Sequence, residues 1–419
     1  MQLPELFRFI PLLPIYRAHT LVFISPLNTI ESNQIADAVE MLRKAKRPGL
    51  FVGWGARHAR EQLIALAERL EAPVATTLQG LSAFPGNHPL HAGFGFGPAA
   101  VPAARNAFRD CDCPVAIGTR FAEIATGSFG VQVPENLIHI DINPDALNAN
   151  YPAKVAIQGD ATAVLDALLR ALPQAMAPQN QTLRSRIQAD KAAYLKQWLE
   201  HDSGDRINPG HFFSTLRRQL DDEDFVVVDD GNHTYLSAEL MPIHRPAGFI
   251  CPTDFNCMGY AVPAAIATKL CHPERRVATI VGDGAFMMTC MEIVTATTFK
   301  LGVVYYVFND GELAQIAQAQ QVTYNRTPCT QLGQLNLEGV ALATGAHYLA
   351  LDNADKIEAV MVQANEIAAS GRPVVVDVKI DYSKPTCFTQ GAVKTNFSRF
   401  PLGMKMRFAG RALWRKVLG

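Results

Sequence analysis

Val277-Ala-Thr-Ile-Val-Gly-Asp-Gly-Ala-Phe286, followed further along by Phe308-Asn-Asp-Gly311, is the most informative stretch of this 419-residue chain. Two apolar runs, at 277–281 and 303–308, predict β-strands, and the segment 287–299 between them is compatible with a helix. A strand–helix–strand unit of this length joins parallel strands. The stretch therefore predicts an α/β fold with a parallel sheet.

Two polar residues, Asp283 and Asn309, follow the ends of these strands. Ligands of open α/β sheets bind at that edge. The glycines Gly282 and Gly284 let the backbone approach a ligand closely, and the amides at a helix start favour an anion. A carboxylate and an amide oxygen suit Mg²⁺, which also takes phosphate oxygens. The pattern indicates a Mg²⁺-diphosphate site, although such residues are common in βα turns of any kind.

The Gly-Asp-Gly turn with an Asn downstream resembles the signature of thiamine-diphosphate (ThDP) enzymes. The resemblance implies that ThDP and Mg²⁺ are the cofactors. The metal ligands that it implies are Asp283, Asn309 and the backbone carbonyl of Gly311. The cofactor contacts that it implies here are Gly282, Gly284, Ala285 and Gly311. The family usually has Asn-Asn, and in this chain Phe308 replaces the first Asn while the metal-binding second one is retained.

Two further motifs resemble the acetohydroxyacid (acetolactate) synthases of this family. Asp229-Asp-Gly-Asn-His233 follows an apolar run, as Asp-x-Gly-Gln-His does in the synthases, which implies that Asn232 and His233 contact the diphosphate. Cys257-Met-Gly-Tyr-Ala-Val-Pro263 resembles Thr-Met-Gly-Phe-x-Leu-Pro, which implies that Met258 props the cofactor in a bent conformation. The role of Met258 rests on this resemblance alone, since a Met before a helix usually only fills space in the packing of side chains.

The first half of the chain resembles the FAD-contacting region of the same synthases. Gly118-Thr-Arg-Phe121 with Thr126-Gly127 is similar to their Gly-x-Arg-Phe-x(4)-Thr-Gly stretch. The residues that this implies for FAD are Arg120, Phe121, Thr126 and Gly127. Glycine-rich loops follow strands in any α/β domain. A bound FAD and a dinucleotide-type fold kept as a scaffold are therefore both left open.

The alternation of strand and helix patterns predicts two doubly wound, parallel-sheet domains in an α/β protein. The first is a central, dinucleotide-type domain, and the second binds the diphosphate. The resemblance covers roughly residues 20 to 380. The predicted segments are 1–20 (unmatched), 21–172 (central domain), 173–206 (linker and helix), 207–381 (diphosphate-binding domain) and 382–419 (basic C-terminal tail).

The chain departs from the family pattern in two ways. The match begins near residue 21, so the N-terminal domain that binds the aminopyrimidine ring and supplies a catalytic Glu is expected to be absent. Without that Glu, the proton relay that activates the cofactor is lost, and the isolated chain is expected to turn over little. Ala319 stands where the synthases have a Trp in their acceptor pocket. Gln315 and Gln318 either face that pocket or form a polar helix surface, and the surface is the expectation.

Bulk composition excludes several classes of protein. The chain has 48% hydrophobic residues, 38 basic and 39 acidic ones, which is typical of an ordinary enzyme and gives no reason to expect nucleic acid. Its eight cysteines lack metal-ligand spacing and are typical of a reducing compartment. Prolines interrupt the apolar N-terminal stretch, so neither a signal nor a spanning segment is expected there, and a cytoplasmic location is expected.

The leading hypothesis is an acetolactate synthase-like enzyme that decarboxylates a 2-oxoacid such as pyruvate and joins the product to a second carbonyl. One alternative is a decarboxylase of the benzoylformate or oxalyl-CoA type. The other is a ThDP- or nucleotide-binding paralogue or subunit without turnover. The expected partners are a small 2-oxoacid and either further copies of the chain, as a homo-oligomer, or a partner chain that supplies the pyrimidine domain.

The tail carries eight basic and no acidic residues from Lys384 onward. Arg407 and Arg411 lie on one side of a helical wheel and apolar residues on the other, which suits an interfacial helix on an anionic membrane surface. Gly403 and Gly410 weaken such a helix when it stands free. We therefore expect an arm that packs over the cofactor site or onto a neighbouring subunit.

Overall fold

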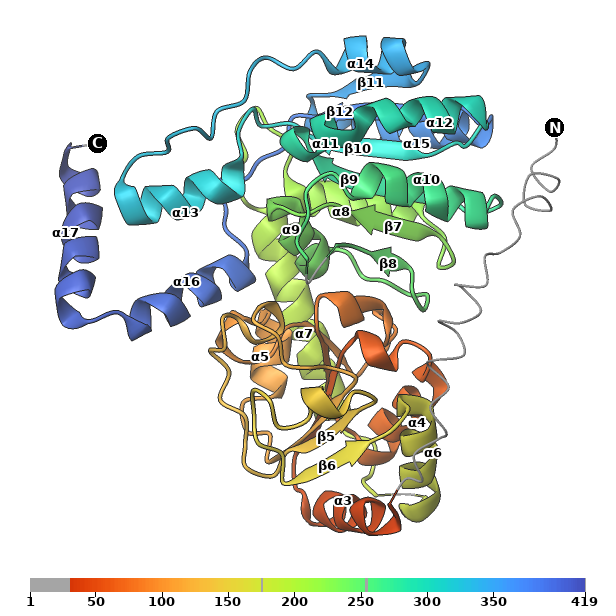
Figure 1. The fold of residues 1–419 in the computed structure, drawn as a ribbon, viewed down its shortest axis with the longest axis vertical. Helices are drawn as coiled ribbons and strands as arrows, with labels where there is room; N and C mark the ends of the chain where they lie inside the picture. The colour runs from red at the N-terminus through yellow and green to blue at the C-terminus, as the bar shows by residue number, and fades with distance from the viewer. Residues whose placement is uncertain (1–30, 175, 253–254, 419) are drawn as a thin grey trace.

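The computed structural model describes residues 31–174, 176–252 and 255–418, and the unmatched segment 1–20 lies outside them. The described residues form two six-stranded parallel sheets with helices packed on them, one domain above the other in Figure 1. The predicted fold class, two doubly wound parallel-sheet domains, is confirmed.

The first sheet has the strand order β3-β2-β1-β4-β5-β6, which reverses direction between β1 and β4. Helices α3, α4 and α6 cover one face, and α5 covers the other. Its strands are β1 (Pro48–Val52), β2 (Val74–Thr76), β3 (His91–Phe94), β4 (Cys113–Ile117), β5 (Ile138–Asp141) and β6 (Val155–Gln158). Its helices are α3 (Ser32–Lys44), α4 (Arg60–Leu70), α5 (Pro102–Ala107) and α6 (Ala161–Ala171).

The second sheet has the strand order β11-β12-β10-β9-β7-β8. Helices α10, α11, α12 and α14 pack on one face, and α8, α9 and α15 pack on the other. Its strands are β7 (Phe225–Val228), β8 (Phe249–Ile250), β9 (Val277–Gly282), β10 (Val304–Phe308), β11 (His347–Leu351) and β12 (Val374–Val378). Its helices are α8 (Pro209–Gln219), α9 (Asn232–Leu240), α10 (Ala261–Cys271), α11 (Asp283–Thr289), α12 (Ile293–Thr298), α13 (Ala314–Tyr324), α14 (Leu337–Thr344) and α15 (Ile357–Ala369).

The helix predicted over 287–299 is wrong at its start and in its continuity, whereas its end agrees with the end of α12 to within one residue. Helix α11 begins at Asp283, directly after β9, and a 3-10 turn at Cys290–Glu292 separates it from α12. The break lies next to Thr289, whose backbone torsions (φ −138°, ψ 9°) are neither helical nor extended. Thr289 Oγ1 donates a hydrogen bond to the carbonyl of Gly259 instead of to its own helix (2.9 Å). The contact holds the helix break against the turn before α10.

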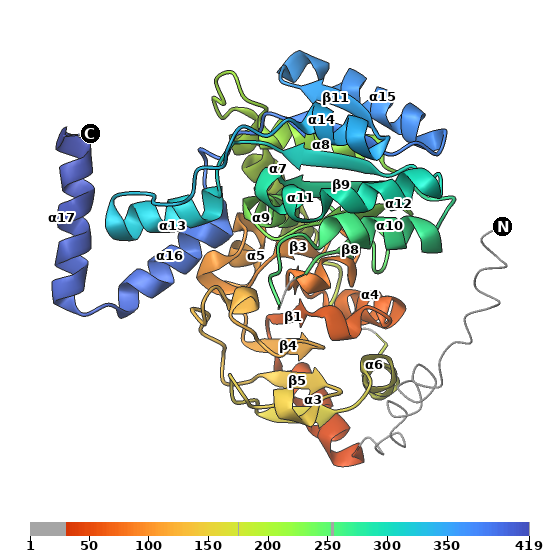
Figure 2. The same ribbon diagram turned by 45° about the horizontal axis from the view of Figure 1, so that its top comes forward.

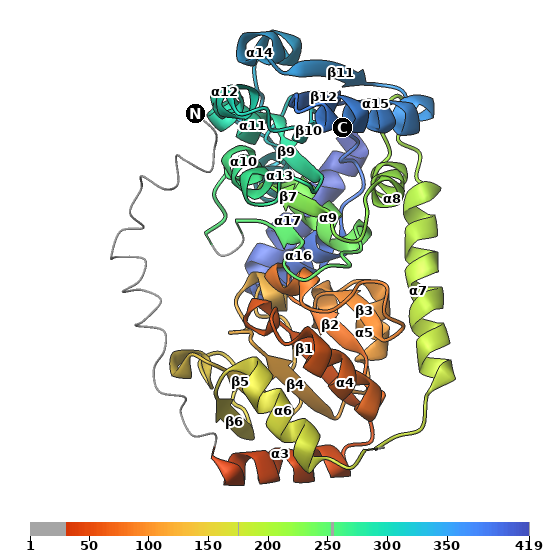
Figure 3. The ribbon, with the colours of Figure 1, turned by 90° about the vertical axis from the view of Figure 1, so that its right-hand side faces the viewer.

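The long helix α7 (Gln181–Leu199) joins the two domains. It runs alongside both of them in Figure 3 and packs against α5 and β3 of the first and α8 of the second. Its start is fixed by an ion pair between Arg184 Nε and Glu71 Oε1 (2.5 Å), and Trp198 near its end is fully buried. Apolar side chains of both domains form one continuous core cluster around it. The two sheets are therefore held as one body.

The C-terminal segment forms two helices, α16 (Cys387–Arg399) and α17 (Leu402–Leu418). Helix α16 packs against α9 and the turn Gly97–Ala99 of the first domain. Helix α17 stands to the side of both domains, beside α13 (Figures 1 and 2). The expected packing of this tail over the cofactor site or onto a neighbouring subunit stays a prediction, and contact with a membrane surface is the alternative to it. No helix in the described part of the chain is long and apolar enough to cross a membrane.

Candidate functional site

The predicted metal ligands lie together at the carboxyl edge of the second sheet. Strands β9 and β10 are neighbours with Gly282 paired to Phe308, so Asp283 and Asn309 leave the sheet side by side. Asp283 Oδ1 accepts a hydrogen bond from the Gly284 N–H (2.7 Å), and its Oδ2 accepts one from the Gly311 N–H (2.8 Å). Asn309 Nδ2 donates to Asp377 Oδ1 (3.0 Å), which leaves the amide oxygen of Asn309 for a cation.

The backbone at Gly311 fits the third ligand position. Its φ of +76° lies in the left-handed region, where a glycine is favoured. Its carbonyl accepts one hydrogen bond, from the Leu332 N–H (2.9 Å), and a carbonyl oxygen has a second lone pair. Three oxygen atoms of the kind that Mg²⁺ prefers are thus available from Asp283, Asn309 and Gly311.

The site is short of positive charge. Burial raises the pKa of Asp283, whose side chain is only 2% exposed, although three backbone N–H groups act in the opposite direction. Burial and the neighbouring Asp283 raise the pKa of Asp310 to about 7. Buried carboxyl groups with raised pKa values are stabilised by a divalent cation, since it supplies the missing opposite charge.

The start of α9 brings two predicted diphosphate contacts to the same place. Gly231 has φ +154°, and a Cβ there would come 2.6 Å from the His233 ring, so the turn needs a glycine. Burial lowers the pKa of His233 to about 3, so the imidazole is neutral. Within the described residues, Asn232 Nδ2 and His233 Nε2 are buried without a hydrogen-bond partner. Buried polar atoms without partners at a helix start fit a phosphate group.

Met258 is positioned by a buried carboxylate. Asp229, fully buried at the end of β7, accepts hydrogen bonds from the N–H groups of Gly259 (2.9 Å) and Ala261 (2.7 Å). This fixes the turn that carries Met258. A Cβ on Gly284 would lie 3.7 Å from Met258 Cε and 2.8 Å from Leu313 Cδ2. Only a glycine therefore leaves the Gly-Asp-Gly turn accessible beneath these two side chains.

One cavity of about 100 Å³ brings most of the predicted residues together. Those that line it are Asn232, His233, Met258, Gly282, Asp283, Gly284 and Ala285. Asn309 and Gly311 are not among the lining residues, although the Gly311 N–H donates to Asp283, which is. The residues that the sequence patterns missed include Asp230, Leu313 and Tyr382. Asp230 lies within the Asp229–His233 motif, so the sequence could have indicated it. Tyr382 lies in no motif, so no sequence pattern points to it.

The expectation that Gln315 belongs to a polar helix surface is wrong. Gln315 lines the cavity, because the first turn of α13 lies over it. Gln318 does not line it, and its Nε2 donates to the backbone carbonyl of Tyr382 (3.1 Å).

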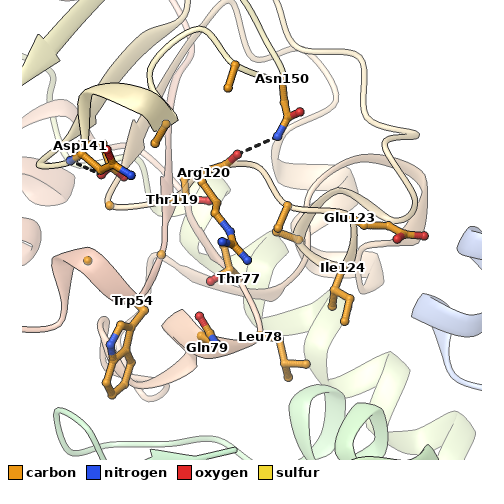
Figure 4. Close-up of a pocket in the computed structure, with 18 of the residues that line it drawn as sticks. Trp54, Thr77, Leu78, Gln79, Thr119, Arg120, Glu123, Ile124, Asp141 and Asn150 are labelled. Atoms are coloured by element: carbon orange, nitrogen blue, oxygen red, sulfur yellow. Dashed lines mark hydrogen bonds between the residues drawn. The ribbon is translucent and has the colours of Figure 1, made fainter. Parts of the chain in front are cut away.

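A larger cavity of about 620 Å³ lies at the carboxyl edge of the first sheet, where the strand order reverses between β1 and β4 (Figure 4). Doubly wound sheets bind dinucleotides at this place. Its floor is made of glycines in close approach, since a Cβ on Gly53 would lie 2.2 Å from the Gly118 carbonyl oxygen. Figure 4 shows the Arg120 side chain extending from the turn after β4 toward Thr77 and Gln79.

Three of the four residues predicted for FAD do not line this cavity. Phe121 is 1% exposed and packs against the ring of Phe51, with 5.7 Å between centroids. Thr126 is buried and donates through Oγ1 to the Ala122 carbonyl (2.9 Å). A Cβ on Gly127 would lie 2.4 Å from Ala99 Cβ. These residues shape the wall of the cavity from behind, and Arg120 alone of the four lines it.

Two models of one protein family match the chain. The model of the thiamine pyrophosphate enzyme central domain matches residues 35–168, and that of the C-terminal TPP binding domain matches residues 229–378. The two matches fall on the two sheets described above.

Curated relatives named as acetolactate synthase large subunits are similar to most of the chain. The acetolactate synthase large subunit of Corynebacterium glutamicum is 30% identical over 92% of this chain and 63% of its own length. The acetolactate synthase isozyme 3 large subunit of Escherichia coli is 30% identical over 86% of this chain and 64% of its own length. The probable acetolactate synthase large subunit of Methanocaldococcus jannaschii is 31% identical over 83% and 60%. The chain thus spans somewhat over half the length of these relatives, and it belongs to the thiamine pyrophosphate enzyme family, with that family's central domain and C-terminal TPP binding domain.

Proposed function

We propose that the chain binds ThDP through Mg²⁺ at the carboxyl edge of the second sheet, as part of an acetolactate synthase-like 2-oxoacid decarboxylase and carboligase. One observation carries the proposal. Oxygen atoms suited to Mg²⁺ on Asp283, Asn309 and Gly311 adjoin a cavity in which Asn232 and His233 have buried polar atoms without partners among the described residues. The names of the relatives compared above support this activity over the benzoylformate and oxalyl-CoA alternatives.

Each side chain has a defined task in this proposal. Asp283, Asn309 and the carbonyl of Gly311 hold Mg²⁺, which neutralises the diphosphate. Asn232 and His233 meet the phosphate oxygens, and the neutral His233 adds no charge that would need a counterion. Met258, fixed through Asp229, supports the cofactor ring. ThDP, when bound, supplies the carbanion chemistry for 2-oxoacid decarboxylation.

We further propose that the pyrimidine side of the site, with its catalytic Glu, comes from a pyrimidine-type domain outside the described residues. A partner chain or another segment of the gene product would contribute it. In either case the residues that bind the diphosphate only position the cofactor. The proton transfer that activates the cofactor needs the pyrimidine-type domain with its Glu.

Calorimetric titration tests the proposed function. ThDP is expected to bind in the presence of Mg²⁺ and to lose its binding heat when EDTA removes the metal, because the diphosphate then faces carboxylates without a cation between them. A pyruvate turnover assay, with and without a candidate pyrimidine-domain protein, follows on the loaded chain. Absence of ThDP binding in Mg²⁺ would contradict the proposal.

We also propose that the cavity of the first domain binds FAD. The strand-order reversal, the glycine floor and the Arg120 side chain support it. Arg120→Ala is expected to weaken FAD binding by about 10- to 100-fold, since a charge-assisted hydrogen bond contributes about 1.5–3 kcal/mol. Quenching of flavin fluorescence on titration measures the affinity, and Arg109→Ala, on the surface of the same domain, is the control. A wild-type chain that leaves flavin fluorescence unchanged would favour the scaffold interpretation instead.

A homo-oligomer is the assembly that we propose. Exposed apolar side chains, which we call the methionine face, lie on α11, the turn after it, α12 and α14, and these elements contact one another. Its members are Met288 (60% exposed), Met291 (61%), Val294 (43%) and Leu342 (83%). Exposed apolar groups that adjoin one another usually mark an interface. Met291→Glu is expected to shift the chain toward monomer in light scattering, whereas Ile142→Glu, equally exposed on the first domain, is not. A wild-type monomer at micromolar concentration would contradict the proposal.

A further inference from the structure

Gln315 is a polar residue that has no role in the cofactor site as proposed above. It is the second residue of α13 and lines the cofactor cavity. Its Oε1 is buried and has no hydrogen-bond partner among the described residues. A buried acceptor without a donor costs about 1–3 kcal/mol. An unpaired amide in the wall of a binding cavity therefore points to a ligand group that completes it.

The position of Gln315 is fixed by its surroundings. The Leu313 N–H donates to the Thr330 carbonyl (2.8 Å) just before α13 begins. One turn later, Gln318 Nε2 is tied to the Tyr382 carbonyl (3.1 Å). These two bonds hold the first turn of the helix over the cavity, next to the Gly-Asp-Gly turn that Leu313 contacts. The amide of Gln315 is therefore presented to whatever lies beside the diphosphate.

The side chains around Gln315 restrict the kind of ligand group that can bind to its amide. Ala319, on the same helix face one turn on, offers neither bulk nor polarity. The carboxylate of Glu312, which also lines the cavity, is engaged by Thr330 Oγ1 (2.8 Å) and Gln331 Nε2 (2.7 Å). Met258 and Leu313 are apolar. Among the cavity-lining residues of α13 and the turn before it, Gln315 thus has a buried polar atom, Oε1, without a partner in the described part of the chain.

A primary amide both donates and accepts hydrogen bonds. A carboxylate could accept from the Gln315 nitrogen but would leave Oε1 without a donor, whereas a hydroxyl group both donates and accepts. A methyl group would leave the buried Oε1 of Gln315 unpaired, and sites built to bind a hydroxyl reject analogues that lack it.

We propose that Gln315 sets the substrate specificity of this site by hydrogen bonding to a hydroxyl group on a short 2-oxoacid. The inference rests on the proposed function, because the substrate is placed by the cofactor beside which Gln315 lies. It assigns to this chain a preference for hydroxylated over purely aliphatic 2-oxoacids.

The test uses the full chain loaded with Mg²⁺-ThDP and reads binding directly, independently of turnover. Pyruvate and 3-hydroxypyruvate, which differ by one hydroxyl group, are titrated into the loaded chain by calorimetry. The wild-type chain is expected to bind 3-hydroxypyruvate about tenfold more tightly, the equivalent of one good hydrogen bond. Gln315→Met is expected to lose that preference. Gln321→Met, at an exposed position on the same helix, is expected to keep it.

The isosteric variant Gln315→Glu tests whether the effect of Gln315→Met is due only to a folding defect. It retains an acceptor for the hydroxyl, so it is expected to keep a preference for 3-hydroxypyruvate while binding both acids more weakly, through charge repulsion. Equal affinity of the loaded wild-type chain for the two acids, or an unchanged preference in Gln315→Met, would overturn the assignment and leave the proposed function intact. A chain that fails to bind ThDP at all would overturn both. Loss of ThDP affinity in Gln315→Met would assign the residue to the cofactor and overturn its role in specificity.

Discussion

Asp283→Ala is expected to lower the affinity of the chain for ThDP in Mg²⁺ by about 100-fold or more. Asp283 supplies the only carboxylate among the three proposed ligands, so its loss removes the charge that compensates the cation. Asn309→Ala is expected to act in the same direction but less strongly, because it removes a neutral oxygen ligand and leaves Asp377 without one of its donors.

The structure complicates the Ala variant at this position. Asp283 also accepts hydrogen bonds from the N–H groups of Gly284 and Gly311, so its removal loosens the turn as well as the metal site. Asp283→Asn separates the two effects, since the amide keeps an acceptor for the turn and loses the charge. Isothermal titration measures ThDP affinity and thermal unfolding monitors the fold, with the exposed Asp352→Ala as control. Wild-type ThDP affinity in Asp283→Asn would show that the metal is bound elsewhere.

Sequence patterns predicted the central strands β7, β9 and β10 of the second sheet, for a physical reason. Strands that are buried on both faces are continuous apolar runs, and 225–228 and 277–281 stand out as such. The helix after β9 was harder to predict, because its interruption depends on Thr289 bonding to Gly259, a contact between segments that are distant in sequence. The pattern of neighbouring residues in the sequence does not predict a contact between distant segments.

The same distinction applies to the candidate sites. Asp283, Asn232 and His233 lie in short motifs at strand ends, so their convergence follows from the parallel sheet itself. Phe121 and Thr126 also lie in a motif, yet they support the loop from behind, because the direction of a side chain in a turn depends on the packing around it. Gln315 could not be placed, since polar residues at the start of a helix are as common on surfaces as in cavities.

Glu239→Ala is expected to reduce the free energy of unfolding by about 3 kcal/mol and to release α16. The Glu239 carboxylate, on α9, accepts hydrogen bonds from the Tyr194 hydroxyl and from the N–H groups of Cys387 (3.0 Å) and Phe388 (2.8 Å). It thereby caps the start of α16 and joins it to α7. Its removal leaves three donors unpaired, and each costs about 1–3 kcal/mol where it stays buried.

Release of α16 has a consequence for the first domain. Arg399 donates to the Phe129 carbonyl (2.8 Å), and Asn396 Nδ2 donates to Ser128 Oγ (3.2 Å). Phe129 lines the larger cavity, so α16 supports one wall of that cavity. Faster proteolytic cleavage within 384–400 in Glu239→Ala would report the release. Glu200→Ala is the control, because its exposed pair with Lys196 contributes at most about 1 kcal/mol.

The pH dependence of the same contact gives a second, independent readout. Burial raises the pKa of Glu239 to about 7, and this effect outweighs its three hydrogen bonds. The folded chain then binds this proton more tightly than the unfolded chain does, whose Glu has an ordinary pKa near 4.3. The resulting stabilisation is complete below that value and is lost as the pH rises through about 7. Glu239→Gln, which cannot titrate, is therefore expected to cost more stability at pH 5.5 than at pH 8 in denaturant melts. A cost that grows toward pH 8 would mean that the carboxylate is charged throughout and that the helix start, rather than burial, dominates its pKa.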